Sequence, residues 1–357
     1  MTYGPKACSK GHPHLINGSL IEFLPSFPPA HLMKTQPLDF EKPIAELERR
    51  LDDLRRHSRA QNMDFDPEMR RIQAKIEEMK RNVYSHLDAW QRVLIARHPQ
   101  RPFMLDYITL AFSDFVELHG DRLFSDDKAM PCGLAKIDGI RCVVIGHQKG
   151  RDVKENLMRN FGSAHPEGYR KALRVMRLAE KFNLPVVALV DTPGAYPGVE
   201  AEERHISEAI AVNLREMMML KVPIVSIIIG EGGSGGALGI AVADRLLMLE
   251  NSYYSVISPE GCAAILWKSS VHKAAAAKAM KLTAQDLHQL KLIDEVIAEP
   301  LGGAHHDHGA TAAALQEAVV RHLRELAAKP EALLLRERYA KFRQIGAFGV
   351  PANSSKS

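Results

Sequence analysis

Two short and almost wholly apolar runs, at residues 185–190 and 223–229, limit the folds open to this chain. Each run is only long enough for a β-strand, and neither alternates with charged residues. Both therefore predict strands that are buried on both faces of a sheet. Each run leads into a loop rich in glycine or proline and then into a helical pattern. This alternation favours an α/β fold in which helices stack on a mostly parallel sheet.

Composition excludes several classes of protein. The chain has 357 residues, of which 46% are hydrophobic, so it can bury one large core or two modest ones. Its 47 Lys and Arg nearly balance 43 Asp and Glu, which gives no global basic excess for nucleic acid. No apolar run is long enough to span a membrane, so we expect a cytoplasmic protein with no membrane partner. The four cysteines, Cys8, Cys132, Cys142 and Cys262, form no C-x-x-C pair, and we expect no metal site in the chain.

The chain divides into four segments by pattern. Residues 1–37 carry nine Pro and Gly and no sustained apolar period, so we expect a disordered extension, with Met33 as the natural start. Residues 38–100 are helical in pattern, residues 101–345 are mixed α/β, and residues 346–357 are expected to be a disordered tail.

The helical segment predicts a hairpin. Apolar residues from Ile44 to Leu54 recur at steps of three and four, a break follows at 58–65, and Asp66-Pro67 begins a second helix. Trp90 and Leu94 extend the apolar stripe of that helix. The hairpin either packs on its own domain or is an arm that binds a partner. Acidic residues alternate with its arginines, which makes a nucleic-acid surface unlikely.

The mixed segment predicts a regular series of elements after residue 101. In chain order these are a helix at 106–118, a β-hairpin of 133–137 and 140–145, a helix from about 166, the strand at 185–190, a helix after 198 through Met217, the strand at 223–229, a helical stretch at 237–243, and helices at 310–328 and 331–344.

The strongest chemical signal is the turn at 230–236, which places five glycines in seven residues between a buried strand and a helix. Glycine lets the backbone adopt positive φ and lets a ligand approach its N–H groups closely. The following helix adds unpaired N–H groups and the positive end of its dipole. Such a turn suits an anion, or an oxyanion that develops during a reaction.

Other interpretations of this turn are weaker. A Walker phosphate loop needs Lys and Ser or Thr where Gly236 and Ala237 stand, and a dinucleotide fingerprint lacks its acidic residue about 20 positions on. A nucleophile elbow remains open, because Ser234 lies in G-x-S-x-G with acids and histidines downstream. A tight turn that merely needs small residues also remains open. The downstream candidates for the triad are Asp286, Asp294, His305, His306 and His308.

Longer blocks of sequence identify the family. From Leu38 to about Arg343 the chain resembles the alpha subunit of the bacterial-type acetyl-coenzyme A carboxylase carboxyltransferase. The blocks that carry the resemblance are LDFEKPIAELE (38–48), ARHPQRP (96–102), IGHQKGRD (145–152), PEGYRKALR (166–174), DTPGAYPGVEAEER (191–204), GEGGSGGALGI (230–240), YSVISPEGCAAILWK (254–268) and LKLIDEVIAEPLGGAH (290–305).

This resemblance implies a crotonase-type fold of repeated β-β-α units. It implies transfer of a carboxyl group from carboxybiotin to acetyl-CoA, giving malonyl-CoA for fatty-acid biosynthesis. The implied partners are a beta subunit, in an α2β2 assembly, a biotin carboxyl carrier protein that holds the biotin, and a biotin carboxylase that uses ATP. The beta subunit would carry the only zinc and most of the coenzyme A site.

The resemblance also assigns roles in the glycine turn. The backbone N–H groups of Gly235 and Gly236 would form the oxyanion hole for the ureido oxygen of biotin. No side-chain base is then needed, and Ser234 is small rather than nucleophilic. The residues expected to line this binding site are Gly232, Gly233, Ser234, Gly194 and Ala195.

Two further groups of polar residues are candidates. Lys149 and Arg151, together with Arg170 and Lys171, either bind coenzyme A phosphates or a partner's acidic surface, or are solvated charges. Glu231 either orients the turn or pairs across the subunit boundary. The histidine-rich 304–308 loop is expected to be a polar loop rather than a metal site.

Overall fold

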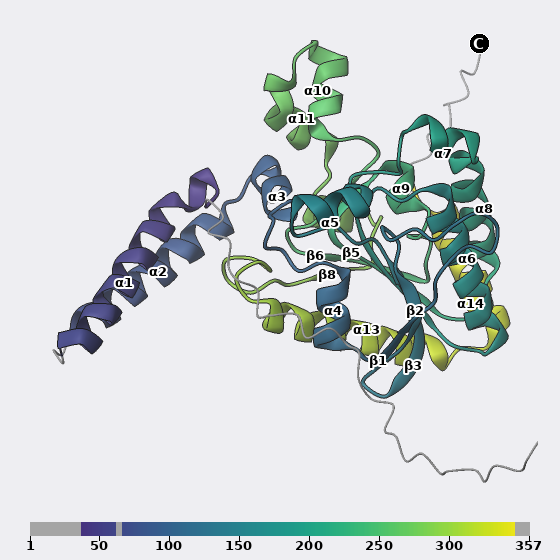
Figure 1. The fold of residues 1–357 in the computed structure, drawn as a ribbon, viewed down its shortest axis with the longest axis horizontal. Coiled ribbons are helices and arrows are strands. Elements are labelled where there is room, and N and C mark those ends of the chain that lie inside the picture. The colour runs from purple at the N-terminus through teal and green to yellow at the C-terminus, as the bar shows by residue number, and fades with distance from the viewer. Residues whose placement is uncertain (1–36, 62–65, 347–357) are drawn as a thin grey trace, which may run out of the picture. The chain divides into compact units, whose positions relative to one another are not determined.

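A mixed β-sheet organises the fold. The computed structural model describes residues 37–61 and 66–346, so the expectations for residues 1–36 and 347–357 and for Met33 lie outside the described residues. Within the described residues the sheet has eight strands in the order β1-β2-β3-β4-β5-β6-β8, and β7 pairs with the carboxyl end of β5. Figure 1 shows the sheet with helices packed around it. The strands are β1 Ser113–Glu117, β2 Cys132–Ile137, β3 Ile140–Gly146, β4 Val186–Thr192, β5 Ile224–Gly233, β6 Arg245–Leu249, β7 Tyr253–Ser255 and β8 Glu295–Ile297.

The direction of the strands matches the sequence prediction. The predicted hairpin is β2 and β3, which pair antiparallel on either side of the Asp138-Gly139 turn. From β3 through β4, β5, β6 and β8 every pairing is parallel. The two apolar runs are therefore neighbouring strands, β4 and β5, inside the parallel part of the sheet.

Helices connect and cover these strands. The α-helices are α1 Lys42–Gln61, α2 Asp66–Ser85, α3 Ala89–Ala96, α4 Met104–Ala111, α5 Val153–Met158, α6 Pro166–Lys181, α7 Val199–Glu203, α8 Ile206–Met219, α9 Ser234–Leu238, α10 Pro259–Trp267, α11 Lys273–Met280, α12 Ala284–Gln289, α13 His308–Ala327 and α14 Glu331–Arg343. Short 3-10 helices are η1 Asp39–Glu41, η2 Asn160–Gly162 and η3 Ser270–His272.

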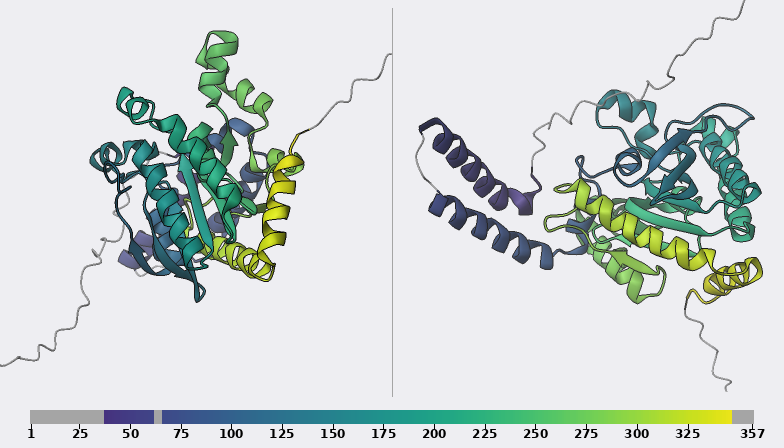
Figure 2. Two further views of the ribbon diagram at one scale, coloured as in Figure 1. Left: turned by 90° about the vertical axis from the view of Figure 1, so that its right-hand side faces the viewer. Right: turned by 90° about the horizontal axis from the view of Figure 1, so that it is seen from below.

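The sheet separates two apolar clusters, as strands buried on both faces require. In β4, Val186 and Val190 point into a cluster that includes α6 and α8, whereas Val187 and Leu189 point into a cluster that includes α4 and α13. Figure 2 shows α13 running along its face of the sheet. The side chains of β4 therefore alternate between the two clusters with the period of two expected of a strand. The apolar core thus supports β4 and β5 from both faces of the sheet.

The predicted hairpin is present and has an apolar cluster of its own. Ile44 and Leu51 of α1 pack against Ile72 and Ile76 of α2. Helix α1 continues to Gln61, beyond the predicted break at Ser58, and residues 62–65 lie outside the described part.

The third helix of this segment departs from the prediction. Trp90 does not extend the stripe of α2, because that helix ends at Ser85 and Trp90 belongs to α3. Helix α3 instead packs near Tyr253 and Ala277.

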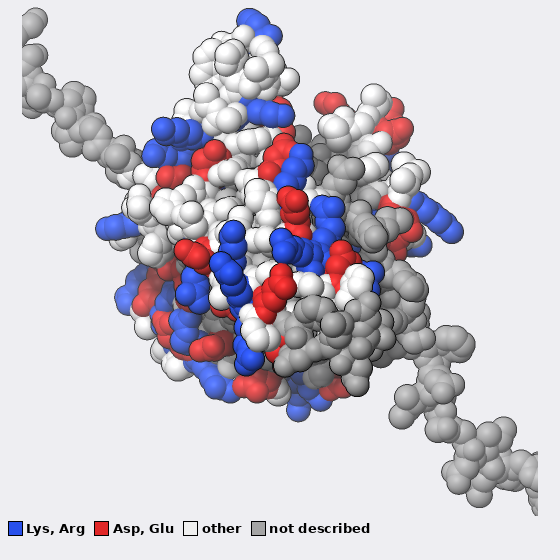
Figure 3. All heavy atoms as spheres, turned by 90° about the vertical axis from the view of Figure 1, so that its left-hand side faces the viewer, with Lys and Arg blue, Asp and Glu red and all other residues white. Residues whose placement is uncertain are grey.

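The charges of the hairpin are mixed. Figure 3 shows Lys and Arg interleaved with Asp and Glu over this side of the molecule. Ion pairs join Arg50 to Glu68 and Lys80 to Glu48. The described residues therefore offer neighbouring carboxylates, rather than a continuous phosphate-binding stripe, beside these cations.

Three other predicted helices need correction. The helix expected at 106–118 ends at Ala111, and residues from Ser113 form the edge strand β1, because β2 offers an open edge to pair with. The helix after Gly198 is two helices, divided where His205 adopts a φ of 63°. The helical stretch expected at 237–243 is the end of α9, which stops at Leu238. Among the described helices, none is both long and apolar enough to cross a membrane.

Candidate active site

The carboxyl ends of β4 and β5 meet at the glycine turn. Gly232 pairs with Thr192 of β4 on one side and with Tyr254 of β7 on the other. Strand β5 thus holds the first half of the turn in extended backbone, and α9 begins directly after it at Ser234. The turn lies where the carboxyl ends of parallel strands form ligand sites in α/β sheets.

Two of the predicted glycines are required by close backbone packing. A Cβ atom on Gly233 would lie 2.1 Å from the carbonyl oxygen of Pro193, and one on Gly236 would lie 2.3 Å from the amide nitrogen of Ala195. Neither position has room for a side chain. The loop that contains Gly194 and Ala195 therefore lies directly against the first turn of α9, and a shared binding site for these residues stays a prediction.

Gly235 is different, because space is open beside it. A Cβ atom on Gly235 would meet only the Cδ1 atom of Ile210, at an ordinary 3.7 Å. Ser234 is exposed and has a φ of 52°. The N–H groups of this first turn have no partner within the helix. They are donors that an approaching anion could reach.

Two buried side chains, Tyr169 of α6 and Asn213 of α8, hydrogen-bond to the backbone in and beside the glycine turn. The Tyr169 hydroxyl donates to the carbonyl oxygen of Gly236 at 3.1 Å. The Asn213 amide donates to the carbonyl oxygens of Tyr169 and Gly239, both at 3.1 Å. Tyr169 and Asn213 are fully or almost fully buried. Sequence reasoning missed both residues, since each resembles an ordinary core position of its helix.

Lys149 pairs with one carboxylate from β4 and one from β5. Its Nζ atom donates to Asp191 Oδ1 at 2.6 Å and to Glu231 Oε1 at 2.8 Å. Asp191 Oδ1 also accepts the backbone N–H of Glu231 at 2.9 Å. Burial alone raises the pKa of Glu231, but Lys149 and Arg97 outweigh it and hold that pKa at about 2. Glu231 is therefore paired within this chain.

Arg97 completes this ionic network from α3. Its Nε atom donates to Glu231 Oε2 at 2.7 Å, and its Nη1 atom donates to Glu260 Oε1 at 2.6 Å. The Tyr253 hydroxyl donates to Glu231 Oε2 at 2.6 Å. No sequence pattern indicates this network beyond the position of Glu231, because Arg97 is 134 residues away from it.

The other predicted cations also have partners in the chain. Arg151 donates to the carbonyl oxygens of Pro99 and Arg101 and pairs with Asp106. Arg170 pairs with Asp121, and Lys171 pairs with Asp126. Among the described residues these side chains hold neighbouring loops, and their role toward coenzyme A remains a prediction.

Among the described residues, no histidine is hydrogen-bonded to Ser234. The Ser234 hydroxyl has no hydrogen-bond partner there, whereas His308 Nε2 donates to the carbonyl oxygen of Gln100 at 2.6 Å. His305 is bonded to Glu41. A serine hydrolase needs its histidine beside the nucleophile, so this geometry does not support the nucleophile elbow.

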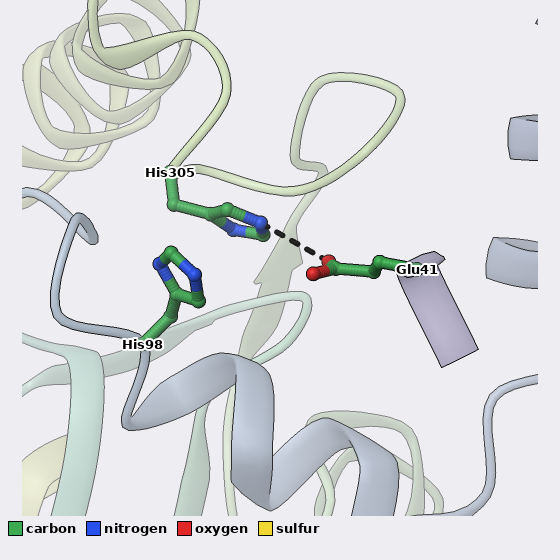
Figure 4. Close-up of side chains that lie close together, drawn as sticks. All are labelled: Glu41, His98 and His305. Carbon is green, nitrogen blue, oxygen red and sulfur yellow. Dashed lines mark hydrogen bonds and ion pairs between the residues drawn. The ribbon is translucent and has the colours of Figure 1, made fainter. Parts of the chain in front are cut away.

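Glu41, His98 and His305 form the cluster most like a metal site (Figure 4). They are buried, and one potential ligand atom from each lies within 4.8 Å of the others. Glu41 already accepts hydrogen bonds from the Tyr84 hydroxyl at 2.5 Å and the Leu38 N–H at 3.0 Å, and it is 3.2 Å from His305 Nε2. These contacts explain the cluster as a hydrogen-bonded link between η1 and the 304–308 loop.

The protonation states of Glu41 and His98 are consistent with this hydrogen-bonded link. Burial raises the pKa of Glu41, but hydrogen bonds from His305 and Tyr84 hold it at about 2. Burial lowers the pKa of His98 to about 4. Glu41 is thus ionised and His98 neutral near pH 7.

Known proteins resemble this chain over nearly all its described length. A family model described as acetyl co-enzyme A carboxylase carboxyltransferase-like matches residues 37–346. An acetyl-coenzyme A carboxylase carboxyl transferase subunit alpha from Geobacter metallireducens is 56% identical over 87% of this chain and 98% of its own. The protein of the same name from Thermus thermophilus is 52% identical over 88% of this chain and 100% of its own.

Solved structures of low identity share the fold. A transcarboxylase 12S structure has a TM-score of 0.51 at 19% identity and covers 63% of this chain and 41% of that chain. A Pseudomonas malonate decarboxylase hetero-dimer has a TM-score of 0.51 at 18% identity and covers 61% of this chain and 90% of that chain. The expected crotonase-type α/β fold is confirmed. By sequence, the chain belongs to the family of acetyl-coenzyme A carboxylase carboxyltransferase alpha subunits.

Proposed function

We propose that this chain, together with a beta subunit, transfers a carboxyl group from carboxybiotin to acetyl-CoA and so forms malonyl-CoA. Membership of the family supports carboxyl transfer. The observation that carries the site assignment is the contrast within the glycine turn. Gly233 and Gly236 are packed against backbone, whereas Gly235 has open space beside it.

The donors of the turn support a site for the ureido group of biotin. When bound there, biotin would supply the carboxyl group, and the turn would stabilise negative charge on its ureido oxygen. The N–H groups of Gly235 and Gly236 would donate to this oxygen, and the dipole of the first turn favours the same charge. The buried hydrogen bonds of Tyr169 and Asn213 would hold these donors in position before the reaction, so that little reorganisation would be needed.

The rest of the site would come from other chains. We infer a beta subunit that contributes zinc, most of the coenzyme A site and the donors for the thioester oxygen, in an α2β2 assembly in the cytoplasm. Biotin would arrive on a biotin carboxyl carrier protein, after a biotin carboxylase has charged it with ATP. Gly194 and Ala195 would border the entrance, because their loop lies against α9.

A reconstitution assay in the reverse direction tests this function. The purified chain would be mixed with its beta subunit, malonyl-CoA and biocytin, and release of acetyl-CoA would be followed. We expect activity only when both chains are present. The control is each chain alone at the same concentration. A well-folded pair that binds but releases no acetyl-CoA would contradict the proposal.

A further inference from the structure

We propose that Lys149 is a positioning residue, which joins the ends of β4 and β5 and thereby aims the first turn of α9. This inference rests on the proposed function, because it concerns the same site. It replaces the expectation that Lys149 meets the phosphates of coenzyme A. The argument has three parts: the contacts of the ammonium, the charges that would remain without it, and the path from Lys149 to the turn.

The contacts leave the ammonium little capacity for a ligand. Lys149 Nζ is 2.6 Å from Asp191 Oδ1 and 2.8 Å from Glu231 Oε1, and the side chain is only 13% exposed. The two carboxylates are themselves 1% and 9% exposed. An ammonium has three donor hydrogens, and two are directed to these carboxylates. A phosphate would therefore have only one remaining donor to bind, on an almost buried side chain whose charge two carboxylates already share.

The charges explain why the cation is needed. Asp191 is the second-to-last residue of β4, close to the loop that carries Gly194, and Glu231 lies in β5 directly before Gly232. Both acids share one ammonium, although Glu231 is also paired with Arg97. Loss of Lys149 would leave the buried carboxylate of Asp191 facing Glu231 without the cation that it pairs with. Their repulsion would separate the strand ends that the backbone pairing of Thr192 with Gly232 holds together.

A short series of contacts connects Lys149 to the glycine turn. Asp191 Oδ1 accepts the N–H of Glu231, and Gly230 permits this approach because a Cβ there would lie 2.6 Å from the same oxygen. Two residues beyond Glu231, Gly233 rests on the Pro193 carbonyl and leads into α9. A shift of the strand end would therefore move the N–H groups of Gly235 and Gly236.

The structure also provides a matched control at the opposite end of β5. There Asp244 Oδ2 accepts the N–H of Ile224 at 2.7 Å, and Arg338 pairs with the same oxygen at 2.7 Å. The side chains of Arg338 and Asp244 are 0% and 3% exposed. This is a buried ion pair that holds the same strand, but it lies at the end away from the glycine turn.

The test compares Lys149→Met with Arg338→Met in the reconstituted pair. We expect Lys149→Met to lower kcat about 10²-fold, the scale expected when catalytic donors are misplaced by about 1 Å. The KM for malonyl-CoA should not change. Arg338→Met should lower the unfolding temperature, while the properly folded fraction keeps its kcat. A raised KM with an unchanged kcat for Lys149→Met would overturn the proposal and restore the coenzyme A role.

A second variant tests whether repulsion between Asp191 and Glu231 causes the loss of kcat in Lys149→Met. Glu231→Gln removes one of the two facing charges, and its amide can donate to Asp191. We therefore expect the double variant Lys149→Met with Glu231→Gln to recover part of the kcat lost in Lys149→Met. No recovery, or an equal loss of kcat in Arg338→Met, would contradict positioning through charge. If Lys149→Met does not fold, the double variant takes its place, and a kcat equal to that of the wild type would refute the positioning role of Lys149.

The wild-type pair distinguishes this inference from the function on which it rests. An inactive wild-type pair would overturn the proposed carboxyl transfer, and the positioning role with it. An active wild-type pair with an unaffected Lys149→Met variant would overturn the positioning role alone.

Discussion

Gly235 and Gly236 are adjacent, yet the structure requires glycine at only one of them. Gly236 must lack a side chain because Ala195 N would lie 2.3 Å from its Cβ. Gly235 has room for a methyl group, so its contribution to the proposed site is its N–H and the access to it. The two residues therefore call for different experiments.

The role of the Gly235 N–H can be tested with a pair of variants. Gly235→Pro removes the N–H, and we expect it to reduce kcat about 10²–10³-fold, as for loss of one oxyanion donor. Gly235→Ala keeps the N–H and adds only the methyl group, so it should retain much more activity. Acetyl-CoA release gives the rates, and circular dichroism and binding to the beta subunit check folding. Equal loss in both variants would show that access, rather than the donor, is limiting.

Ser234 gives a second prediction at this scale. Its hydroxyl has no partner within the described residues, and no triad histidine is beside it. Ser234→Ala should therefore retain substantial carboxyl transfer, and neither protein should hydrolyse an activated ester. Complete loss of transfer together with ester hydrolysis by the wild type would favour the nucleophile elbow instead.

The sequence could identify the glycine turn but not the residues that hold it. Five glycines between a strand and a helix are a local pattern, and the family resemblance gave them a role. Lys149 and Arg97 are instead defined by partners far along the chain, at Asp191 and Glu231. Their chemistry alone suited a phosphate equally well, because spacing does not reveal which carboxylates will face a cation.

At the scale of elements, strands buried on both faces were easiest to predict. Strands β4 and β5 are nearly continuous in apolar residues, a pattern with few other solutions. Strand β1 lies in a stretch for which the sequence predicts a helix, because Ile108, Ala111 and Phe115 recur at steps that also suit a helix. Residues 113–117 form a strand because the open edge of β2 is available to pair with them. A short stretch of sequence does not reveal such a pairing partner.

The helical hairpin should lose stability separately from the sheet. Its apolar cluster is distinct from the two clusters beside the sheet. Ile76 is 3% exposed, so Ile76→Ala should destabilise the hairpin by about 2–5 kcal/mol. Hydrogen exchange should accelerate in α1 and α2 and remain unchanged in β4 and β5. Glu46→Ala, at an exposed position of α1, is the control. Equal acceleration in β5 would show that hairpin and sheet unfold together.

At the scale of the whole molecule, buried ion pairs predict sensitivity to acid. Burial raises the pKa of Glu299, but Arg101 outweighs it and holds that pKa at about 2, against an ordinary 4.5. Glu41 and Glu231 are also held at about 2. The unfolded chain takes up these protons at a higher pH than the folded chain. The free energy of unfolding should therefore fall as the pH drops from 4.5 toward 2.

Urea unfolding at a series of pH values would measure this dependence. Glu41→Gln removes one of the three groups, so its stability should be lower at pH 6 and should fall less steeply in acid. A stability that stays constant between pH 5 and pH 3 would contradict the prediction.

Because Arg338 of α14 anchors β5, the order in which the ribosome makes these elements affects when β5 becomes stable. Arg338, close to the last described helical residue, donates to the carbonyl oxygens of Met217, Leu220 and Val222 and pairs with Asp244. A ribosome completes β5 long before it adds Arg338. Until then Asp244 lacks its cation and these carbonyl groups lack their donor. The central strand therefore reaches its final stability only after α14 has been made, and until then chaperones would meet an intermediate with an unfinished sheet.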